Sequence, residues 1–442
     1  MTKTVVTLDD RYEQRSGQIF ISSMQALVRL PLDQKRRDVA VGLRTGGYVS
    51  GYRGSPITTL DAQLWAAQKQ LDAHDIHFEP GLNEELAATS LRGTQQLGWF
   101  GKTRFDGVFA MWYGKGLGVD RACEALKLGN FEGTHAQGGV LIVAGDDHAA
   151  KSSASAHQSE HTLIAGFIPI LAPSTTAEIL EYGQSGWEMS RYSGLYVGLK
   201  TVTDTLDLTS SVLLPSISVI RPALAPGQNL NLRRGLPALA QESLVVNERL
   251  PATLAFARAN GLNRVIIGPA RPPLVIVTAG KSYLDVRQAL RDLGLDEARC
   301  AALGIGVVKL GLIWPLDQEF IRAACAGARK VLVVEEKRPV IEEQLTNALY
   351  GLTGERPEIL GKRDEQGRAL FPQDNVLDAT MVRHAILHRL ERLGLADAAL
   401  SRCAATLDAM AATAISPPPP YARHFSAPAA RITPAPTSPR TA

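Results

Sequence analysis

The stretch Gly-Tyr-Val-Ser-Gly-Tyr-Arg-Gly-Ser-Pro, residues 47–56, runs from a short apolar segment directly into a turn of glycine, serine and proline. Such a run predicts a buried strand over 47–52 that ends in a strand-to-helix turn. Two interpretations of the turn stay open. Ser55 can cap the next helix, with Pro56 at the first helical position. Alternatively, the glycines let the backbone approach a ligand, and Ser55 offers its hydroxyl to a carboxylate or carbonyl group.

The same alternation of strand and helix patterns continues through the first half of the chain. Further strands are predicted over 107–112, 140–144, 168–171 and 195–200, and helices over 60–73, 84–97, 119–128 and 176–189. This alternation is typical of a parallel sheet with helices on both faces. Most of the predicted strands end in turns rich in Gly, Ser or Asp, where α/β folds bind ligands. We therefore expect a doubly wound α/β domain over residues 1–221.

The rest of the chain divides into three parts. Residues 222–270 are rich in proline and glycine, which predicts a connecting segment with a helix near 242–259. A second α/β unit follows over 271–395, with strands predicted at 274–279, 306–309 and 330–335 and helices at 284–293, 317–326 and 340–349. Residues 396–442 are rich in proline and alanine, which predicts a disordered tail.

Composition narrows the class of protein. A chain of 442 residues, 45% hydrophobic and 21% charged, predicts two or three globular domains. The formal net charge of +3 is dispersed, so we expect no nucleic-acid partner. The first residues are polar and acidic, and no apolar run is long enough to cross a bilayer, which predicts a cytoplasmic protein without membrane contact. The four cysteines lack the spacing of a zinc or iron–sulfur site.

Two further motifs follow the first turn. Asn83-Glu84-Glu85 opens the predicted helix 84–97, and physical chemistry alone explains acids there by their favourable interaction with the helix dipole. A glycine-rich turn that includes Gly114 and Gly116 suggests phosphate binding at a helix N-terminus. Its glycines are spaced two apart, however, and do not form a G-x-G-x-x-G pattern.

A fourth motif follows the strand predicted over 140–144. Residues 145–148 read Gly-Asp-Asp-His, and a Ser-Ser pair follows at 152–153. His157 and His161 are four residues apart, so a metal site with the two aspartates is conceivable. No other residue supports such a site. Solvated loop residues are the preferred interpretation, and no metal ligand is assigned.

In this order, the motifs resemble the 2-oxoacid:ferredoxin oxidoreductase family, most closely its indolepyruvate:ferredoxin oxidoreductase branch. The resemblance covers roughly residues 18–394, including residues 278–283, 309–316, 333–336 and 341–345 of the second unit. It implies a pyrimidine-binding domain of a thiamine diphosphate enzyme, followed by a transketolase-C-terminal-like α/β domain. It also implies structural and interface roles for four glutamates of the second unit: Glu335, Glu336, Glu342 and Glu343.

The resemblance assigns roles to individual residues of the first domain. Glu84, with Glu85 as its competitor, matches the glutamate that hydrogen-bonds the aminopyrimidine ring of thiamine and so activates the cofactor. Ser55 and Arg53 are expected to orient the carboxylate or carbonyl group of the substrate. The residues expected to line the cofactor are Gly54, Pro56, Asn83, Gly114, Gly116, Asp146 and Asp147.

The sequence lacks the Gly-Asp-Gly turn with which this family holds the diphosphate, because the only Gly-Asp pair, Gly145-Asp146, is followed by Asp147. We therefore expect the chain to bind only the pyrimidine half of thiamine diphosphate and to be inactive alone. A diphosphate-binding domain or subunit would supply the other half, Mg²⁺, iron–sulfur clusters and the coenzyme A site, in a dimer or larger complex. The expected substrate is a 2-oxoacid such as indolepyruvate or another aryl pyruvate. The expected electron acceptor is ferredoxin or a similar protein.

Two alternatives stay open. The first is a non-catalytic assembly subunit that keeps the fold and docks to a catalytic chain. In that case, replacing Glu84 would change turnover little. The second is another thiamine-dependent enzyme, a decarboxylase or a ligase, which also needs the diphosphate domain but no ferredoxin. Dependence on the electron acceptor would identify it.

The tail carries a separate hypothesis. Fused members of the family begin their diphosphate-binding domain with a segment like C-S-G-C-P-H-N-T-S-T. One permitted coding sequence for residues 426–436, read two bases later, spells this segment without a gap. A frameshift near Pro420 in a longer fused enzyme would explain this, and a genuine low-complexity tail is the alternative. Translating the coding DNA in all three frames would distinguish the two.

Overall fold

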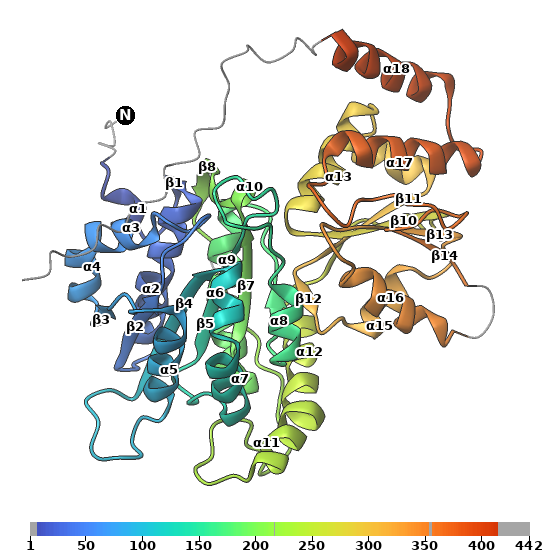
Figure 1. Ribbon diagram of the computed structural model, residues 1–442. Helices are drawn as coiled ribbons and strands as arrows, with labels where there is room; N and C mark the ends of the chain where they lie inside the picture. Colours follow the sequence, from blue (N-terminus) through green and yellow to red (C-terminus); the bar gives the residue numbers. More distant parts are fainter. Residues whose placement is uncertain (1–6, 216, 353–355, 414–442) are drawn as a thin grey trace, which may run out of the picture.

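The computed structural model describes residues 7–215, 217–352 and 356–413 (Figure 1). Its first domain is built on a seven-stranded sheet with the strand order β12-β6-β7-β5-β4-β2-β3. The strands are β2 (Thr45–Gly51), β3 (Ile76–Phe78), β4 (Gly107–Lys115), β5 (Val140–Asp146), β6 (Ile170–Leu171), β7 (Val197–Val202) and β12 (Leu312–Trp314). Neighbouring strands are parallel, except that β12 runs antiparallel to β6.

Helices cover both faces of this sheet because its central strands are apolar on both faces. In β5, Leu141 and Val143 contribute to one hydrophobic core, and Val140, Ile142 and Ala144 contribute to the other. The helices of the first core are α2 (Ser23–Ala40), α3 (Leu60–Ala66), α4 (Gln68–Ala73), α9 (Thr176–Ser193) and α12 (Leu250–Ala259). Those of the second are α5 (Glu84–Gln95), α6 (Gly116–Arg121), α7 (Cys123–Glu132) and α8 (Glu160–Ala165). The expected doubly wound α/β fold is confirmed.

Shorter elements complete this part of the chain. Strands β1 (Gln18–Ser22) and β8 (Thr209–Leu213) form a two-stranded antiparallel ribbon. The short helices are α1 (Asp10–Glu13) and α10 (Thr203–Leu206). In the predicted connecting segment, α11 (Ala238–Leu244), a π-helical turn (Val245–Arg249) and α12 follow one another without a break. They occupy the region where the sequence predicts a helix near 242–259.

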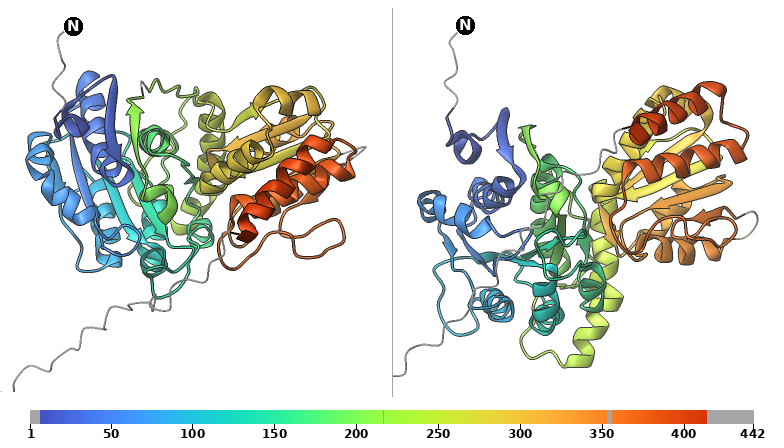
Figure 2. Two further views of the ribbon diagram at one scale, coloured as in Figure 1. Left: turned by 90° about the horizontal axis from the view of Figure 1, so that it is seen from above. Right: turned by 45° about the horizontal axis from the view of Figure 1, so that its top comes forward.

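The second domain contains a five-stranded sheet with the order β14-β13-β10-β11-β9. Its strands are β9 (Arg264–Ile267), β10 (Leu274–Ala279), β11 (Ile305–Leu310), β13 (Lys330–Val334) and β14 (Glu358–Leu360). Helices α13 (Gly280–Asp292), α14 (Glu297–Leu303), α17 (Ala379–Arg392) and α18 (Ala398–Thr413) pack on one face. Helices α15 (Gln318–Ala324) and α16 (Ile341–Tyr350) pack on the other face. In both views of Figure 2 this domain, yellow to red, lies to one side of the first.

Strand β12 joins the two domains. It follows β11 in the chain but leaves the second sheet and pairs with β6 at the edge of the first, with Leu312 opposite Leu171 and Trp314 opposite Ile170. The backbone N–H of Ala172 also donates to the carbonyl of Gly311, at 2.9 Å. The two domains therefore do not separate at the single boundary near residue 271 that the sequence predicts. Strand β9 of the second sheet begins earlier, at Arg264, and β12 belongs to the first sheet.

The expectation of a disordered tail from residue 396 is wrong for its first part. Residues 398–413 form helix α18, and Leu400 and Ala404 are buried in the core that α13 and α17 share. Leucine and alanine at four-residue spacing lie on one face of a helix, so this segment can bury an apolar stripe. The rest of the predicted tail, from residue 414, lies outside the described residues.

Within the part of the chain that the structure describes, no helix combines the length and apolar character needed to span a bilayer.

Candidate functional site

The sequence motifs meet at the carboxyl ends of β2, β4 and β5. The backbone N–H of Tyr52 donates to the carbonyl of Tyr113 at the end of β4, at 3.0 Å. The N–H of Gly81, two residues before Asn83, donates to the carbonyl of Gly51 at 2.8 Å. Because parallel strands end at the same edge of a sheet, the turns after them form one continuous surface. This edge is where open α/β sheets bind ligands.

The turn at 51–56 needs its first glycine. A Cβ atom on Gly51 would overlap the carbonyl oxygen of Tyr113. A Cβ atom on Gly54 would lie 2.6 Å from Cδ of Lys115. Arg53 between them is exposed, so its guanidinium group is available at the edge of the sheet. The backbone of the turn therefore packs against the end of β4, while Arg53 extends into solvent.

Ser55 connects the first motif to the fourth. Its hydroxyl shares a hydrogen bond with the hydroxyl of Ser152, and its carbonyl accepts a hydrogen bond from the hydroxyl of Ser153 at 3.1 Å. Pro56 packs toward Gly145, whose Cβ would lie 3.3 Å from Cδ of Pro56. The structure thus places the Ser-Ser pair in contact with the turn at 51–56. The sequence shows only the order of these two motifs along the chain.

Glu84 is the first residue of α5 and is buried, with 5% of its surface exposed, whereas Glu85 is exposed. The helix begins there because the side chain of Asn83 accepts a hydrogen bond from the N–H of Leu86, at 2.9 Å. Trp112 fixes the first turn from the sheet, since its indole N–H donates to the carbonyl of Glu84 at 3.0 Å. Of the two candidate glutamates, only Glu84 is buried at this edge of the sheet.

The carboxylate of Glu84 faces helix α6. A Cβ atom on Gly118 would lie 2.7 Å from Cγ of Glu84, so α6 approaches as closely as a glycine allows. Nε of Arg121 lies 3.8 Å from Oε2 of Glu84. Among the described residues, no donor reaches this carboxylate within hydrogen-bonding distance. Glu84 therefore keeps its hydrogen-bonding capacity in a nearly solvent-free position.

The glycines two residues apart are explained by three different neighbours. A Cβ atom on Gly114 would overlap the ring of Trp112, and one on Gly116 would overlap the ring of His157. A Cβ atom on Gly118 would overlap the side chain of Glu84. Close packing of β4 and α6 against these side chains accounts for the spacing without a dinucleotide.

Asp146, which is buried, and His157, which is half-buried, form a polar pair beside α6. Asp146 is fully buried and accepts hydrogen bonds from the N–H of Ser159 at 2.9 Å and from its hydroxyl at 2.5 Å. Burial acts to raise the pKa of Asp146, but the hydrogen bond from His157 and the charge of Lys200 outweigh it and hold that pKa well below its usual range. These partners occupy Asp146, so its expected contact with a cofactor stays a prediction.

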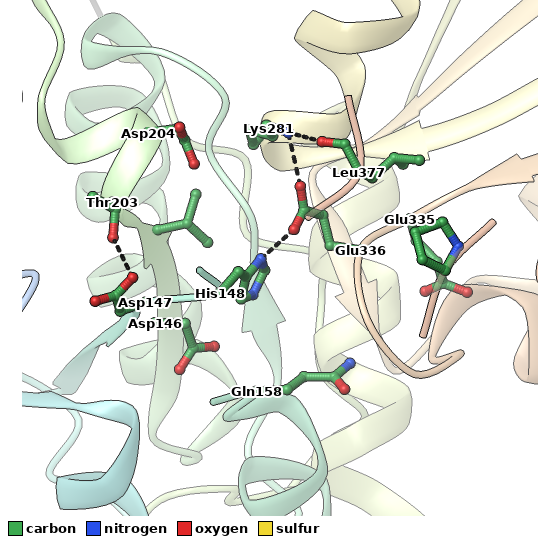
Figure 3. Close-up of polar contacts among 12 residues, drawn as sticks. Asp146, Asp147, His148, Gln158, Thr203, Asp204, Lys281, Glu335, Glu336 and Leu377 are labelled. Atoms are coloured by element: carbon green, nitrogen blue, oxygen red, sulfur yellow. Dashed lines mark hydrogen bonds and ion pairs between the residues drawn. The ribbon is translucent and has the colours of Figure 1, made fainter. Parts of the chain in front are cut away.

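Asp147 shapes the loop that follows β5. It accepts hydrogen bonds from the backbone N–H groups of Lys151 and Ser152, at 3.1 and 3.0 Å. It also accepts one from the hydroxyl of Thr203 at 3.5 Å (Figure 3). Burial acts to raise the pKa of Asp147, but these backbone donors lower it. Asp147 therefore holds the Ser-Ser pair beside Ser55.

The second domain reaches this loop through Glu336. Nδ1 of His148 lies 2.5 Å from Oε2 of Glu336, and Nζ of Lys281 donates to Oε1 at 2.9 Å (Figure 3). Around these residues lies a cavity of about 50 Å³ that Lys200 and Glu160 also line. The sequence gives no sign of this contact between the domains.

The neighbouring Glu335 has a structural role in helix α16. Its carboxylate accepts from the N–H groups of Val340, Ile341 and Glu342, at 3.0, 2.8 and 2.9 Å. Burial raises the pKa of Glu335 to about 7, although these backbone donors act to lower it. Glu342 accepts from the N–H of Lys362 at 2.8 Å. These contacts are consistent with the structural and interface roles expected for the glutamates of the second unit.

The histidines of the fourth motif do not form a metal site with the two aspartates. Within the described ranges, no three His, Cys, Asp or Glu side chains are placed to hold a metal ion. Both ring nitrogens of His157 instead face carboxylates, Asp120 at 2.6 Å and Asp146 at 3.3 Å. Sequence reasoning missed this pairing because Asp120 lies on a different element.

The chain is similar in sequence to known oxidoreductase subunits. Residues 264–414 match the model of the indolepyruvate oxidoreductase domain. The chain is 25% identical over 367 residues to indolepyruvate oxidoreductase subunit IorA of Methanothermobacter thermautotrophicus, covering 81% of this chain and 53% of the relative. IorA of Pyrococcus horikoshii is 24% identical over 313 residues, covering 68% of this chain and 44% of the relative. The chain thus spans about half the length of the curated relatives it matches.

A solved structure shares the fold. The 2-oxoglutarate:ferredoxin oxidoreductase from Magnetococcus marinus, determined with 2-oxoglutarate, coenzyme A and succinyl-CoA bound, superposes with a TM-score of 0.59 and 15% identity. The match covers 85% of this chain and 66% of that chain. Together, these similarities confirm the resemblance to the indolepyruvate-type 2-oxoacid oxidoreductases that the motifs indicate.

Proposed function

We propose that this chain, which resembles the indolepyruvate-type oxidoreductases, is the pyrimidine-binding and transketolase-C-terminal-like part of a thiamine-dependent 2-oxoacid oxidoreductase. The observation that carries the proposal is Glu84, a buried glutamate at the start of α5. It lies at the ligand-binding edge of a doubly wound sheet, and its carboxylate has hydrogen-bonding capacity to spare.

The residues at this edge fit the pyrimidine half of thiamine diphosphate. A protonated carboxyl group can donate a hydrogen bond, so Glu84 can pair with a ring nitrogen of the aminopyrimidine. Leu82 and Leu86 flank it and are 87% and 51% exposed. Exposed leucines beside a buried carboxyl group fit a surface that another domain covers.

The described residues do not fit the diphosphate half. The only Gly-Asp pair of the sequence is Gly145-Asp146, and Asp146 is fully buried and bound by Ser159 and His157. We therefore assign the diphosphate, Mg²⁺, iron–sulfur clusters and coenzyme A to another part of the enzyme or to a partner subunit. The chain alone is expected to show no turnover.

In the complete enzyme, thiamine diphosphate supplies the carbon nucleophile for the oxidative decarboxylation of a 2-oxoacid to an acyl-CoA, with ferredoxin or a similar protein as acceptor. This chain's part is to pair the Glu84 carboxyl group with the aminopyrimidine and to orient the substrate. Arg53 is exposed at the edge, where its guanidinium fork suits a carboxylate. The Ser55 hydroxyl, held by Ser152, suits a carbonyl oxygen. An indolepyruvate or another aryl pyruvate is the substrate that the sequence similarity favours.

The test is to replace Glu84 in the chain assembled with its diphosphate-binding partner. Reduction of methyl viologen that depends on indolepyruvate and coenzyme A is measured. Glu84→Gln should lower kcat by roughly 10²–10⁴-fold, the usual contribution of a positioned acid or base. The matched control is Glu85→Gln, because Glu85 is the next residue of the same helix and is exposed. It should retain the activity of the unaltered complex.

Two results would contradict the proposal. If Glu84→Gln and Glu85→Gln are equally active, Glu84 does not activate a cofactor and the chain is an assembly subunit. If indolepyruvate is consumed when methyl viologen and every other electron acceptor are omitted, the complex is a decarboxylase or a ligase.

A further inference from the structure

His157 lies between carboxylates of two different elements. Its Nε2 is 2.6 Å from Oδ2 of Asp120 on α6, and its Nδ1 is 3.3 Å from Oδ1 of Asp146 at the end of β5. An ionised carboxylate only accepts hydrogen bonds, and both nitrogens of imidazole donate only when the ring is protonated. The geometry therefore fits an imidazolium ion that links α6 to β5.

Both ends of this link are fixed. Asp146 is held from the other side by the N–H and hydroxyl groups of Ser159. The second oxygen of Asp120 accepts from the hydroxyl of Thr162, at 2.6 Å. Gly116, the first residue of α6, packs so closely that a Cβ atom there would overlap the His157 ring. Helix α6 thus rests directly on His157.

The same helix forms the wall beside Glu84. The Cβ position of Gly118 is 2.7 Å from Cγ of Glu84, and Nε of Arg121 is 3.8 Å from Oε2 of Glu84. Gly116, Gly118, Asp120 and Arg121 all lie within the six residues of α6. A shift of α6 would therefore change both the space and the charge around Glu84.

We propose that His157 is a positioning residue: in its protonated form it joins Asp120 to Asp146, fixes α6, and thereby sets the position of Glu84, an inference that rests on the function proposed above. Loss of the proton releases one of the two carboxylates and loosens α6. Several other charged or titratable groups lie near the link, on β7, α5, α6, α8 and the loop after β5. They are Lys200, Glu84, Arg121, Glu160, His161 and His148.

The direction of the pH dependence follows from these neighbours. Burial acts to lower the pKa of His157, but hydrogen bonds and charges from Asp146 and Asp120 outweigh it and raise that pKa above its usual value. A raised pKa means that the link is complete below about pH 6.5, the value for an unfolded chain, and is lost as pH rises through the folded-state pKa. Helix α6 should therefore be held in place in mildly acidic solution and become more mobile as the pH rises.

Amide hydrogen exchange of the full chain tests the link without cofactor or partner. Protection factors, corrected for the intrinsic effect of pH, are compared at pH 6 and pH 9 for the peptide that covers residues 114–121. The unaltered chain should lose protection there by roughly tenfold on going to pH 9, the effect of losing one charge-assisted hydrogen bond. His157→Gln should be poorly protected at both values. Equal protection in His157→Gln and the unaltered chain at pH 6 would overturn the inference.

Two further variants guard against a general effect on folding. Asp120→Asn removes the other end of the link and should reproduce the exchange of His157→Gln. His77→Gln is the matched control, because His77 on β3 also faces a carboxylate but is exposed. Its Nε2 lies 3.5 Å from Oε2 of Glu79, the residue after β3. This variant should behave like the unaltered chain. A loss of α6 protection in His77→Gln, or full protection in Asp120→Asn at pH 6, would contradict the inference.

Turnover of the assembled complex separates this inference from the proposed function. His157→Gln should lower kcat about tenfold near pH 6 with KM within about twofold, and the alkaline loss of kcat that the link causes should vanish. If Glu84→Gln abolishes turnover while His157→Gln keeps the pH profile of the unaltered complex, the positioning role is refuted and the proposed function stands. If Glu84→Gln is fully active, the proposed function is refuted, and with it any role for His157 in catalysis.

Discussion

Replacing Glu336 with glutamine should weaken the contact between the two domains by a measurable amount. Burial acts to raise the pKa of Glu336, but His148 and Lys281 outweigh it and lower that pKa from 4.5 to about 2. At 1.36 kcal/mol per pKa unit, this difference corresponds to about 3 kcal/mol of stability for the ionised form. Removing this carboxylate leaves the buried ammonium group of Lys281 and the ring of His148 without their partner, which has a cost of the same size.

Urea unfolding, followed by circular dichroism between pH 7 and pH 2, measures this contribution. Because the folded-state pKa is depressed, the stability is present above about pH 4.5 and is lost as pH falls through about 2. At pH 7, Glu336→Gln should therefore lower the free energy of unfolding by about 3 kcal/mol, and the difference should shrink toward pH 2. Glu343→Gln, an exposed glutamate on α16, should stay within about 0.5 kcal/mol. Equal stability of Glu336→Gln and the unaltered chain at pH 7, or a difference that does not change with pH, would refute the reasoning.

Two further predictions test the packing at Glu84 and at α18. Gly118→Ala should lower kcat of the assembled complex about tenfold or more, because its Cβ would lie 2.7 Å from Cγ of Glu84 and must displace it, whereas Gly93→Ala, with no atom within 4 Å, should not change kcat. Leu400→Ala should cost about 2–4 kcal/mol in the free energy of unfolding, since Leu400 is fully buried, while the exposed Ser401→Ala should cost less than about 0.5 kcal/mol. A stability of Leu400→Ala equal to that of Ser401→Ala would mean that α18 does not pack on the second domain.

Strands buried on both faces were predictable because they read as continuous apolar runs. Residues 140–144 predict a strand, and β5 extends from Val140 to Asp146. Helix α2 was missed because Pro31 and the charged residues at 35–38 interrupt its apolar pattern. A signal was present, however. Ser22 and Gln25 form a capping box at its start, the spacing that marks a helix N-terminus.

The sequence was enough to predict which turns form the candidate site. It was not enough to predict which side chains contact one another there. Parallel strands place their carboxyl ends together, so the order of the motifs was enough to predict a common edge. The family resemblance favoured Glu84 over Glu85, but only the structure shows which of the two is buried, because burial depends on how α5 packs against Trp112. His148 and Glu336 are 188 residues apart in sequence, and no local pattern pairs them.

Strand β12 makes the connecting segment a poor place to divide this protein. A fragment that stopped before Leu312 would make β6 an edge strand with unpaired backbone N–H and C=O groups. Exposed edge strands of this kind pair with strands of other chains and promote aggregation. A fragment that began near residue 271 would in turn carry three apolar residues, Leu312–Trp314, with no sheet to join. Expression of the two parts from separate genes would therefore succeed only if the two products were made together.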